Sequence, residues 1–107
     1  MKLIYAIVNN DDTYAVSKGL SEAGIRATKL ATTGGFLMKG NTTYMICCDA
    51  EMVDKVIEIC KNYCKKRKQT VSAASVMGGA ADPSSTMEIT IGGATIFVTD
   101  IERFEQV

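Results

Sequence analysis

The sequence predicts an α+β fold with the ferredoxin-like order βαββαβ, in which one antiparallel sheet carries both helices on a single face. Two stretches whose apolar residues recur at helical spacing each lie between stretches rich in β-prone residues. The chain has 107 residues, 47% of them hydrophobic and one of them proline, so it can bury one modest core. We therefore expect residues 1–107 to form a single domain.

The first strand, helix and strand are expected in the N-terminal third. Residues 2–8 form an apolar run typical of a buried strand, and Asn9-Asn10-Asp11-Asp12 supplies turn and N-cap side chains for a helix. Gly24 is a natural stop for that helix, and residues 25–33 predict the second strand. The apolar side of the helix is expected to consist of Ala15, Val16, Leu20 and Ala23.

The rest of the chain predicts a strand, a helix and a hairpin. Residues 41–48 predict a strand rich in threonine, tyrosine and isoleucine, and Asp49 is expected to cap the helix that follows. Residues 69–86 are rich in small residues and predict a long loop, and residues 87–91 and 94–99 predict a hairpin that turns at Gly92-Gly93. The core-facing stripe of the helix is expected to be Val53, Val56, Ile57, Cys60, Tyr63 and Cys64.

The predicted strands are apolar in near-continuous runs, although the helices would cover only one face of the sheet. We expect the second face to pack against other copies of the chain, most simply around a closed symmetric axis.

The charge balance predicts no general affinity for polyanions. Lys and Arg together number 12, as do Asp and Glu, so we expect no nucleic-acid or membrane partner. The basic run Lys65-Lys66-Arg67-Lys68 is expected to be the solvated end of the second helix, where cations suit the helix dipole. Because no apolar run is long enough to span a bilayer and no cleavage site follows the first strand, we expect a cytoplasmic protein.

The residue types predict neither a metal site nor catalysis. Cys47 and Cys48 would point to opposite faces of a strand, and Cys60 and Cys64 would share one helix face without a histidine anywhere in the chain. We expect all four to be small packing residues in a reducing compartment, and we expect no cofactor. Without a histidine or a carboxylate pair in the loop regions, general acid-base chemistry has no candidate and no catalytic residue is assigned.

The stretch "LATTGGFLMKGNTTY", residues 30–44, is the main candidate site. It has the two-glycine spacing of a phosphate-binding P-loop, but it lacks the lysine, the hydroxyl and the following helix. Gly34-Gly35 can still hold a phosphate with backbone N–H groups, Arg26 offers a fork of donors, and Phe36 offers an aromatic face for a base. The Asn41 amide matches an adenine edge. From these residues alone, an ordinary glycine-rich hairpin loop is favoured over a nucleotide site.

Three motifs together resemble one family along almost the whole chain. They are "RATKLATTGGFLMKGNTT" at 26–43, "MGGAAD" at 77–82 and "GGATIFV" at 92–98, and they closely resemble the PII-like cyclic-di-AMP receptor proteins of Gram-positive bacteria. The resemblance implies a homotrimer of ferredoxin-like subunits that binds cyclic-di-AMP between neighbouring subunits, has no enzyme activity, and signals to a protein partner through loops that the ligand orders. It also implies a shorter loop at 33–41 and a longer loop at 69–86 than in true PII proteins.

The resemblance assigns the ligand contacts by motif. It also leaves one alternative, a PII-type sensor of ATP, ADP or 2-oxoglutarate, against which the short first loop argues. At Cys47 this chain departs from the glycine frequent in the family, and a backbone contact is expected there. The implied contacts are Arg26, Thr28, Gly35, Phe36, Leu37, Asn41, Cys47, Phe97 and Gln106.

Overall fold

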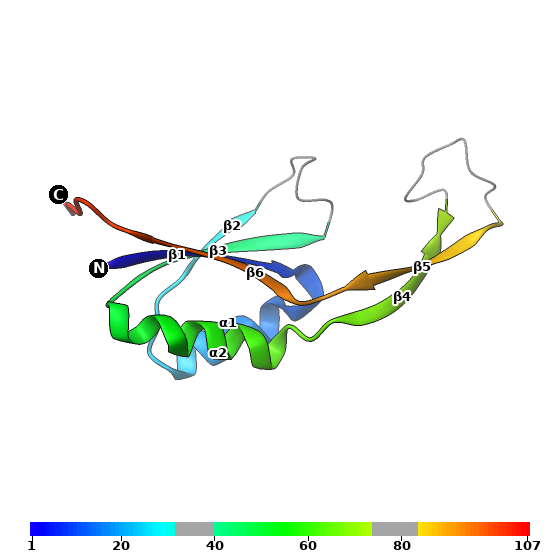
Figure 1. Ribbon diagram of the computed structural model, residues 1–107, viewed down its shortest axis with the longest axis horizontal. Helices are drawn as coiled ribbons and strands as arrows, with labels where there is room; N and C mark the ends of the chain where they lie inside the picture. The colour runs from blue at the N-terminus through cyan, green and yellow to red at the C-terminus, as the bar shows by residue number, and fades with distance from the viewer. Residues whose placement is uncertain (32–39, 74–83) are drawn as a thin grey trace.

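The computed structural model describes residues 1–31, 40–73 and 84–107, which form two α-helices and two antiparallel sheets (Figure 1). The main sheet has four strands and lies on both helices, and a two-stranded ribbon projects beyond it. The main sheet contains, in spatial order, β2 (Thr28–Ala31), β3 (Asn41–Cys48), β1 (Lys2–Asn9) and β6 (Ala94–Asp100). The ribbon consists of β4 (Arg67–Ser72) and β5 (Thr86–Ile91). The helices are α1 (Thr13–Glu22) and α2 (Val53–Tyr63), each preceded by a 3-10 turn, η1 (Asn10–Asp12) or η2 (Ala50–Met52).

The α+β prediction is confirmed, and the main sheet is compatible with the ferredoxin-like order. All neighbouring strands of the main sheet run antiparallel, with β1 between β3 and β6. Both helices lie on the same side of this sheet in Figure 1. This arrangement follows from two β-α-β units whose helices each return the chain along one face.

The core lies between the main sheet and the helices. From Ile4 on, every second residue of β1 is buried and the residues between them are only half-buried, because successive side chains of a strand point to opposite faces. Across the ladder, Ile4 faces Ile46 and Ala6 faces Tyr44. The largest fully buried side chains are Tyr44, Ile4, Leu20, Ile46, Val8, Val16, Val56 and Cys60.

The face opposite the helices is not covered by any described element of this chain. Ladder pairs place Tyr5 opposite both Met45 and Phe97 on that face, and Phe97 is 56% exposed. We call it the open face, defined by Leu3, Tyr5, Ile7, Met45 and Phe97.

The predicted stripe on the second helix is partly correct. Val56, Cys60 and Cys64 are buried as predicted, but Tyr63 is 44% exposed, so its assignment to the core is wrong. Ile59 is buried instead, because α1 packs beside α2 as well as beneath the sheet. The two helices approach each other closely at Gly19 of α1, where an added Cβ would lie 2.9 Å from Cγ2 of Ile59 in α2.

The two helix starts differ in how they are capped. The Asn9 side chain accepts a hydrogen bond of 2.9 Å from the backbone N–H of Asp11, which confirms the predicted cap of the first helical segment. The Asp49 side chain makes no capping bond, so the prediction that it caps the second helix is wrong. The turn η2 separates Asp49 from α2, and the Asp49 carbonyl accepts from Met52 N–H at 2.9 Å.

The predicted C-terminal hairpin is wrong. Strand β5 pairs with β4, from Arg67 opposite Ile91 to Ser72 opposite Thr86, whereas β6 pairs with β1. Gly92 and Gly93, with φ of 86° and 73°, carry the chain from one sheet to the other instead of turning a hairpin.

Strands also occupy both ends of the stretch 69–86 that was predicted to be a loop. The second helix ends at Tyr63, and the basic run therefore continues into β4, which begins at Arg67. Most of β4 is exposed, so no burial pattern in the sequence marks it as a strand.

The Tyr44 hydroxyl is a polar group inside the core. It donates to the carbonyl oxygen of Thr13 at 2.9 Å and lies 2.7 Å from Oγ of Ser17. Burial raises the pKa of Tyr44, and the Ser17 hydroxyl opposes that rise.

We expect Tyr44→Phe to destabilise the fold by about 1 to 2 kcal/mol, because it removes these bonds from a buried site. The free energy of unfolding in urea measures this loss. Tyr14, which is 80% exposed, provides the control, because Tyr14→Phe should leave the midpoint of urea unfolding unchanged. Equal midpoints for the two variants would contradict a structural role for the Tyr44 hydroxyl.

Candidate functional site

A cavity of about 1010 Å³ lies where the end of α1, the start of β2, the end of β3 and the C-terminal tail meet. Four of the sequence-predicted contacts line it, namely Arg26, Thr28, Cys47 and Gln106. The other lining residues are Ser17, Leu20, Ser21, Gly24, Ile25, Ala27, Lys29, Tyr44, Met45 and Phe104.

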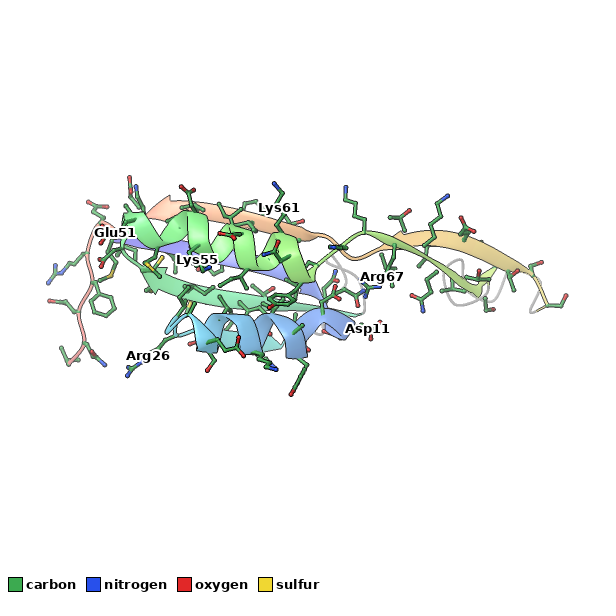
Figure 2. All side chains as sticks on the ribbon, turned by 90° about the horizontal axis from the view of Figure 1, so that it is seen from below. Asp11, Arg26, Glu51, Lys55, Lys61 and Arg67 are labelled. Atoms are coloured by element: carbon green, nitrogen blue, oxygen red, sulfur yellow. The ribbon has the colours of Figure 1, made fainter. Side chains whose placement is uncertain are left out.

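The segment between α1 and β2 positions Arg26. Gly24 ends the helix with φ of 73°, and the N–H of Ile25 donates to the Leu20 carbonyl at 2.9 Å. Ile25 is buried and anchors the segment, whereas Arg26 is exposed and extends away from the body in Figure 2. The strand predicted from residue 25 begins only at Thr28, so Arg26 precedes the strand instead of lying within it.

The guanidinium of Arg26 makes no hydrogen bond or ion pair with the residues in 1–31, 40–73 and 84–107. Its five N–H donors are therefore available to a ligand. A planar guanidinium suits the oxygens of a phosphate or carboxylate, to which it can make two parallel hydrogen bonds.

Strand register places Thr28 and Cys47 on the same face. Thr28 lies opposite Met45, and Cys47 follows Met45 by two residues, so all three point toward the open face. Cys47 is exposed, whereas Cys48 packs against the core, which confirms the prediction that these two cysteines point to opposite faces.

The C-terminal tail supplies the remaining wall of the cavity. The N–H of Ile101 donates to the Met1 carbonyl at 3.1 Å, which holds the start of the tail beside the first strand. Beyond it, Phe104 and Gln106 line the cavity. Phe104 was not predicted as a site residue, although an aromatic residue in a polar tail, two positions before Gln106, is a signal that could have found it. It is 56% exposed and offers a ring to a planar ligand.

The other predicted contacts lie elsewhere. Asn41 stands at the opposite end of β3, facing Asn9, and lines a separate cavity of about 260 Å³ together with Lys66. Phe97 lies on the open face of β6 and does not line the large cavity. Gly35, Phe36 and Leu37 lie outside the described residues, as does most of the glycine-rich stretch.

The prediction that all four cysteines are packing residues is correct for Cys48, Cys60 and Cys64 but wrong for the exposed Cys47. Cys60 and its neighbour Cys64 are free thiols buried in the core. Burial raises the pKa of the Cys60 thiol, and burial together with the nearby Cys60 raises the pKa of Cys64 to about 12. Within the described ranges, no three His, Cys, Asp or Glu side chains gather as metal ligands. The helices of that same part of the chain include none that is both long and apolar enough to cross a membrane.

Comparison with known proteins gives two results. The model of a family described as cyclic-di-AMP receptor matches residues 1–107. A crystal structure of a functionally unknown protein from Pediococcus pentosaceus ATCC 25745 is similar, with 36% sequence identity and a TM-score of 0.71. The match covers 99% of this chain and 96% of that one, so the similarity extends over the whole fold.

Proposed function

This chain belongs to the cyclic-di-AMP receptor family, and we propose that it binds cyclic-di-AMP in the cavity beside Arg26 and passes the binding event to a protein partner. The observation that carries this proposal is the Arg26 guanidinium, which lines a cavity of about 1010 Å³ and is bound by no side chain among the residues that the structure describes. The cavity also brings together Thr28, Cys47 and Gln106, which are far apart in sequence.

The chemistry of the cavity suits a cyclic dinucleotide. The ligand carries two phosphate charges and two purines, so it needs cationic donors and flat apolar surfaces. Arg26 supplies charge-assisted hydrogen bonds to a phosphate, and the Thr28 hydroxyl and Gln106 amide can donate or accept beside it. Phe104 offers an aromatic face, and in this proposal Phe36 stacks on an adenine and Leu37 packs beside it, as the motif implies.

The proposal includes a homotrimer with ligand sites between subunits. The open face presents apolar side chains that a second copy can bury. Within one chain, Asn41 and Phe97 lie apart from the cavity that holds Arg26. A ring of identical subunits would allow Phe97 of one copy to approach the Arg26 cavity of the next, which would unite contacts that one subunit separates.

The oligomeric state is tested by sedimentation equilibrium. We expect a mass three times that of the 11.5 kDa chain at micromolar concentration, because burying the open face removes apolar surface from water. A monomer at that concentration would exclude shared sites.

Ligand identity is tested by calorimetric titration of the trimer with cyclic-di-AMP and, separately, with ATP. We expect saturable binding of cyclic-di-AMP and much weaker binding of ATP. The reverse order would favour a PII-type sensor of ATP or ADP.

Chromatography of the ligand after incubation tests for catalysis, and we expect cyclic-di-AMP to be recovered unchanged.

A further inference from the structure

The turn η1 lies at the end of the main sheet from which the ribbon projects, directly after β1. On one side it contacts the start of β3. The N–H of Asn10 donates to the Gly40 carbonyl at 2.6 Å, and the Thr42 hydroxyl donates to the side-chain oxygen of Asn10. These two hydrogen bonds join the turn to the start of β3.

On its other side the same turn holds the base of the ribbon. Asp12 is 8% exposed, and its two carboxylate oxygens lie 3.2 and 3.3 Å from one nitrogen, Nη1 of Arg67, the first residue of β4. This nitrogen also donates to the Lys65 carbonyl at 3.1 Å. Figure 2 shows Arg67 where α2 gives way to the ribbon, close to the turn that carries Asp11.

The turn is short, and its residues are hydrogen-bonded to one another. The Asn9 side chain accepts from the N–H of Asp11, and the Thr13 hydroxyl donates to the Asn10 carbonyl at 2.8 Å. Only one residue lies between Asn10, which contacts β3, and Asp12, which contacts β4.

The ribbon depends on such an anchor. It consists of β4 and β5 alone, and an isolated pair of strands is at best marginally stable in water. A charge pair with a buried carboxylate at its base is a strong link, because loss of Arg67 leaves the Asp12 charge buried without a partner.

We propose that η1 couples cyclic-di-AMP binding on β2 and β3 to the position of the ribbon, with Asn10 as the contact on the β3 side and the Asp12–Arg67 pair as the contact on the ribbon side. This inference rests on the proposed function and adds the route by which the ligand reaches a second surface. The ligand lies at the Cys47 end of β3, and its binding stabilises the strand along its length. The opposite end of β3, which is bonded to Asn10, is thereby held in place, and the turn presents the Asp12 carboxylate to Arg67. By linkage, a variant that breaks the pair binds the ligand more weakly.

The test is hydrogen exchange of the trimer with and without cyclic-di-AMP, in the wild type and in Arg67→Gln and Asp12→Asn. Wild-type protein should show slower exchange with ligand in both β3 and the ribbon. In both variants the ligand should still slow exchange in β3 but no longer in the ribbon. Affinity for cyclic-di-AMP should fall roughly 5-fold. Asp12→Asn removes the buried charge, so it remains informative if Arg67→Gln folds poorly.

Lys68→Gln is the matched control, because it breaks an ion pair within the ribbon, Lys68 Nζ to Glu88 Oε1 at 3.2 Å, without touching η1. It should preserve both ligand effects. Retention of the ribbon effect in Arg67→Gln and Asp12→Asn, or its equal loss in Lys68→Gln, would overturn the coupling. Slower exchange in β3 alone in the wild type would overturn the coupling and leave the proposed function intact. If cyclic-di-AMP changed hydrogen exchange nowhere in the wild type, both the coupling and the proposed function would be excluded.

Discussion

Arg26→Ala is expected to weaken cyclic-di-AMP binding about 10- to 100-fold. A charge-assisted hydrogen bond to a partly buried phosphate contributes about 1.5 to 3 kcal/mol, and 1.4 kcal/mol corresponds to tenfold in affinity. Arg26 forms no ion pair within the described residues, so its removal should not disturb the fold. Calorimetry measures the affinity, and thermal unfolding without ligand checks that stability is unchanged.

Two variants separate the geometry of the guanidinium from its charge. Lys55→Ala also removes one positive charge, from an exposed site on α2 that does not line the cavity, and it should bind like the wild type (Figure 2). Arg26→Lys keeps the charge without the planar fork and should fall between wild type and Arg26→Ala. Wild-type affinity in Arg26→Ala would show that this arginine does not contact the ligand.

Gly92→Ala is expected to destabilise the protein by about 3 kcal/mol or more. The residue has φ of 86°, a conformation that costs an L-residue about 1 to 2 kcal/mol. A Cβ at this position would also overlap the carbonyl oxygen of Lys65 and lie 2.8 Å from Nη1 of Arg67. Because the obstructing oxygen belongs to the backbone, this overlap can be relieved only if the ribbon shifts. For a chain of this size the melting temperature should fall by more than about 10 °C.

Gly24→Ala is the control for Gly92→Ala. Gly24 has a similar φ of 73°, but an added Cβ there meets nothing within 4 Å. It should therefore cost only the backbone strain, about 1 to 2 kcal/mol. Equal losses of stability in the two variants would mean that the contact between Gly92 and the Lys65 carbonyl does not constrain the ribbon.

Local patterns were enough to predict the elements of the main sheet and the helices. The apolar run in residues 2–8, the cap at Asn9 and the stripe of Val56, Cys60 and Cys64 each depend on neighbours a few residues away, and the structure confirms them. The family also followed from sequence alone, because the motif at 26–43 is long and specific.

Contacts between distant segments could not be predicted in this way. The local sequence of residues 86–100 is compatible with a hairpin in which β5 would pair with β6. In the structure β6 pairs instead with the long apolar strand β1, and β5 pairs with β4. The Asp12–Arg67 pair joins residues 55 positions apart, and the exposed β4 has no periodicity to reveal it.

The sequence by itself determined the fold class, most of the core and the family. The tertiary structure alone decided that Arg26, Cys47 and Gln106 share one cavity while Asn41 and Phe97 do not. The physical reason is that periodicity reports which side of an element is buried, whereas strand pairing and chain reversal determine which elements meet. Those depend on the free energy of the whole packed chain and not on any local segment.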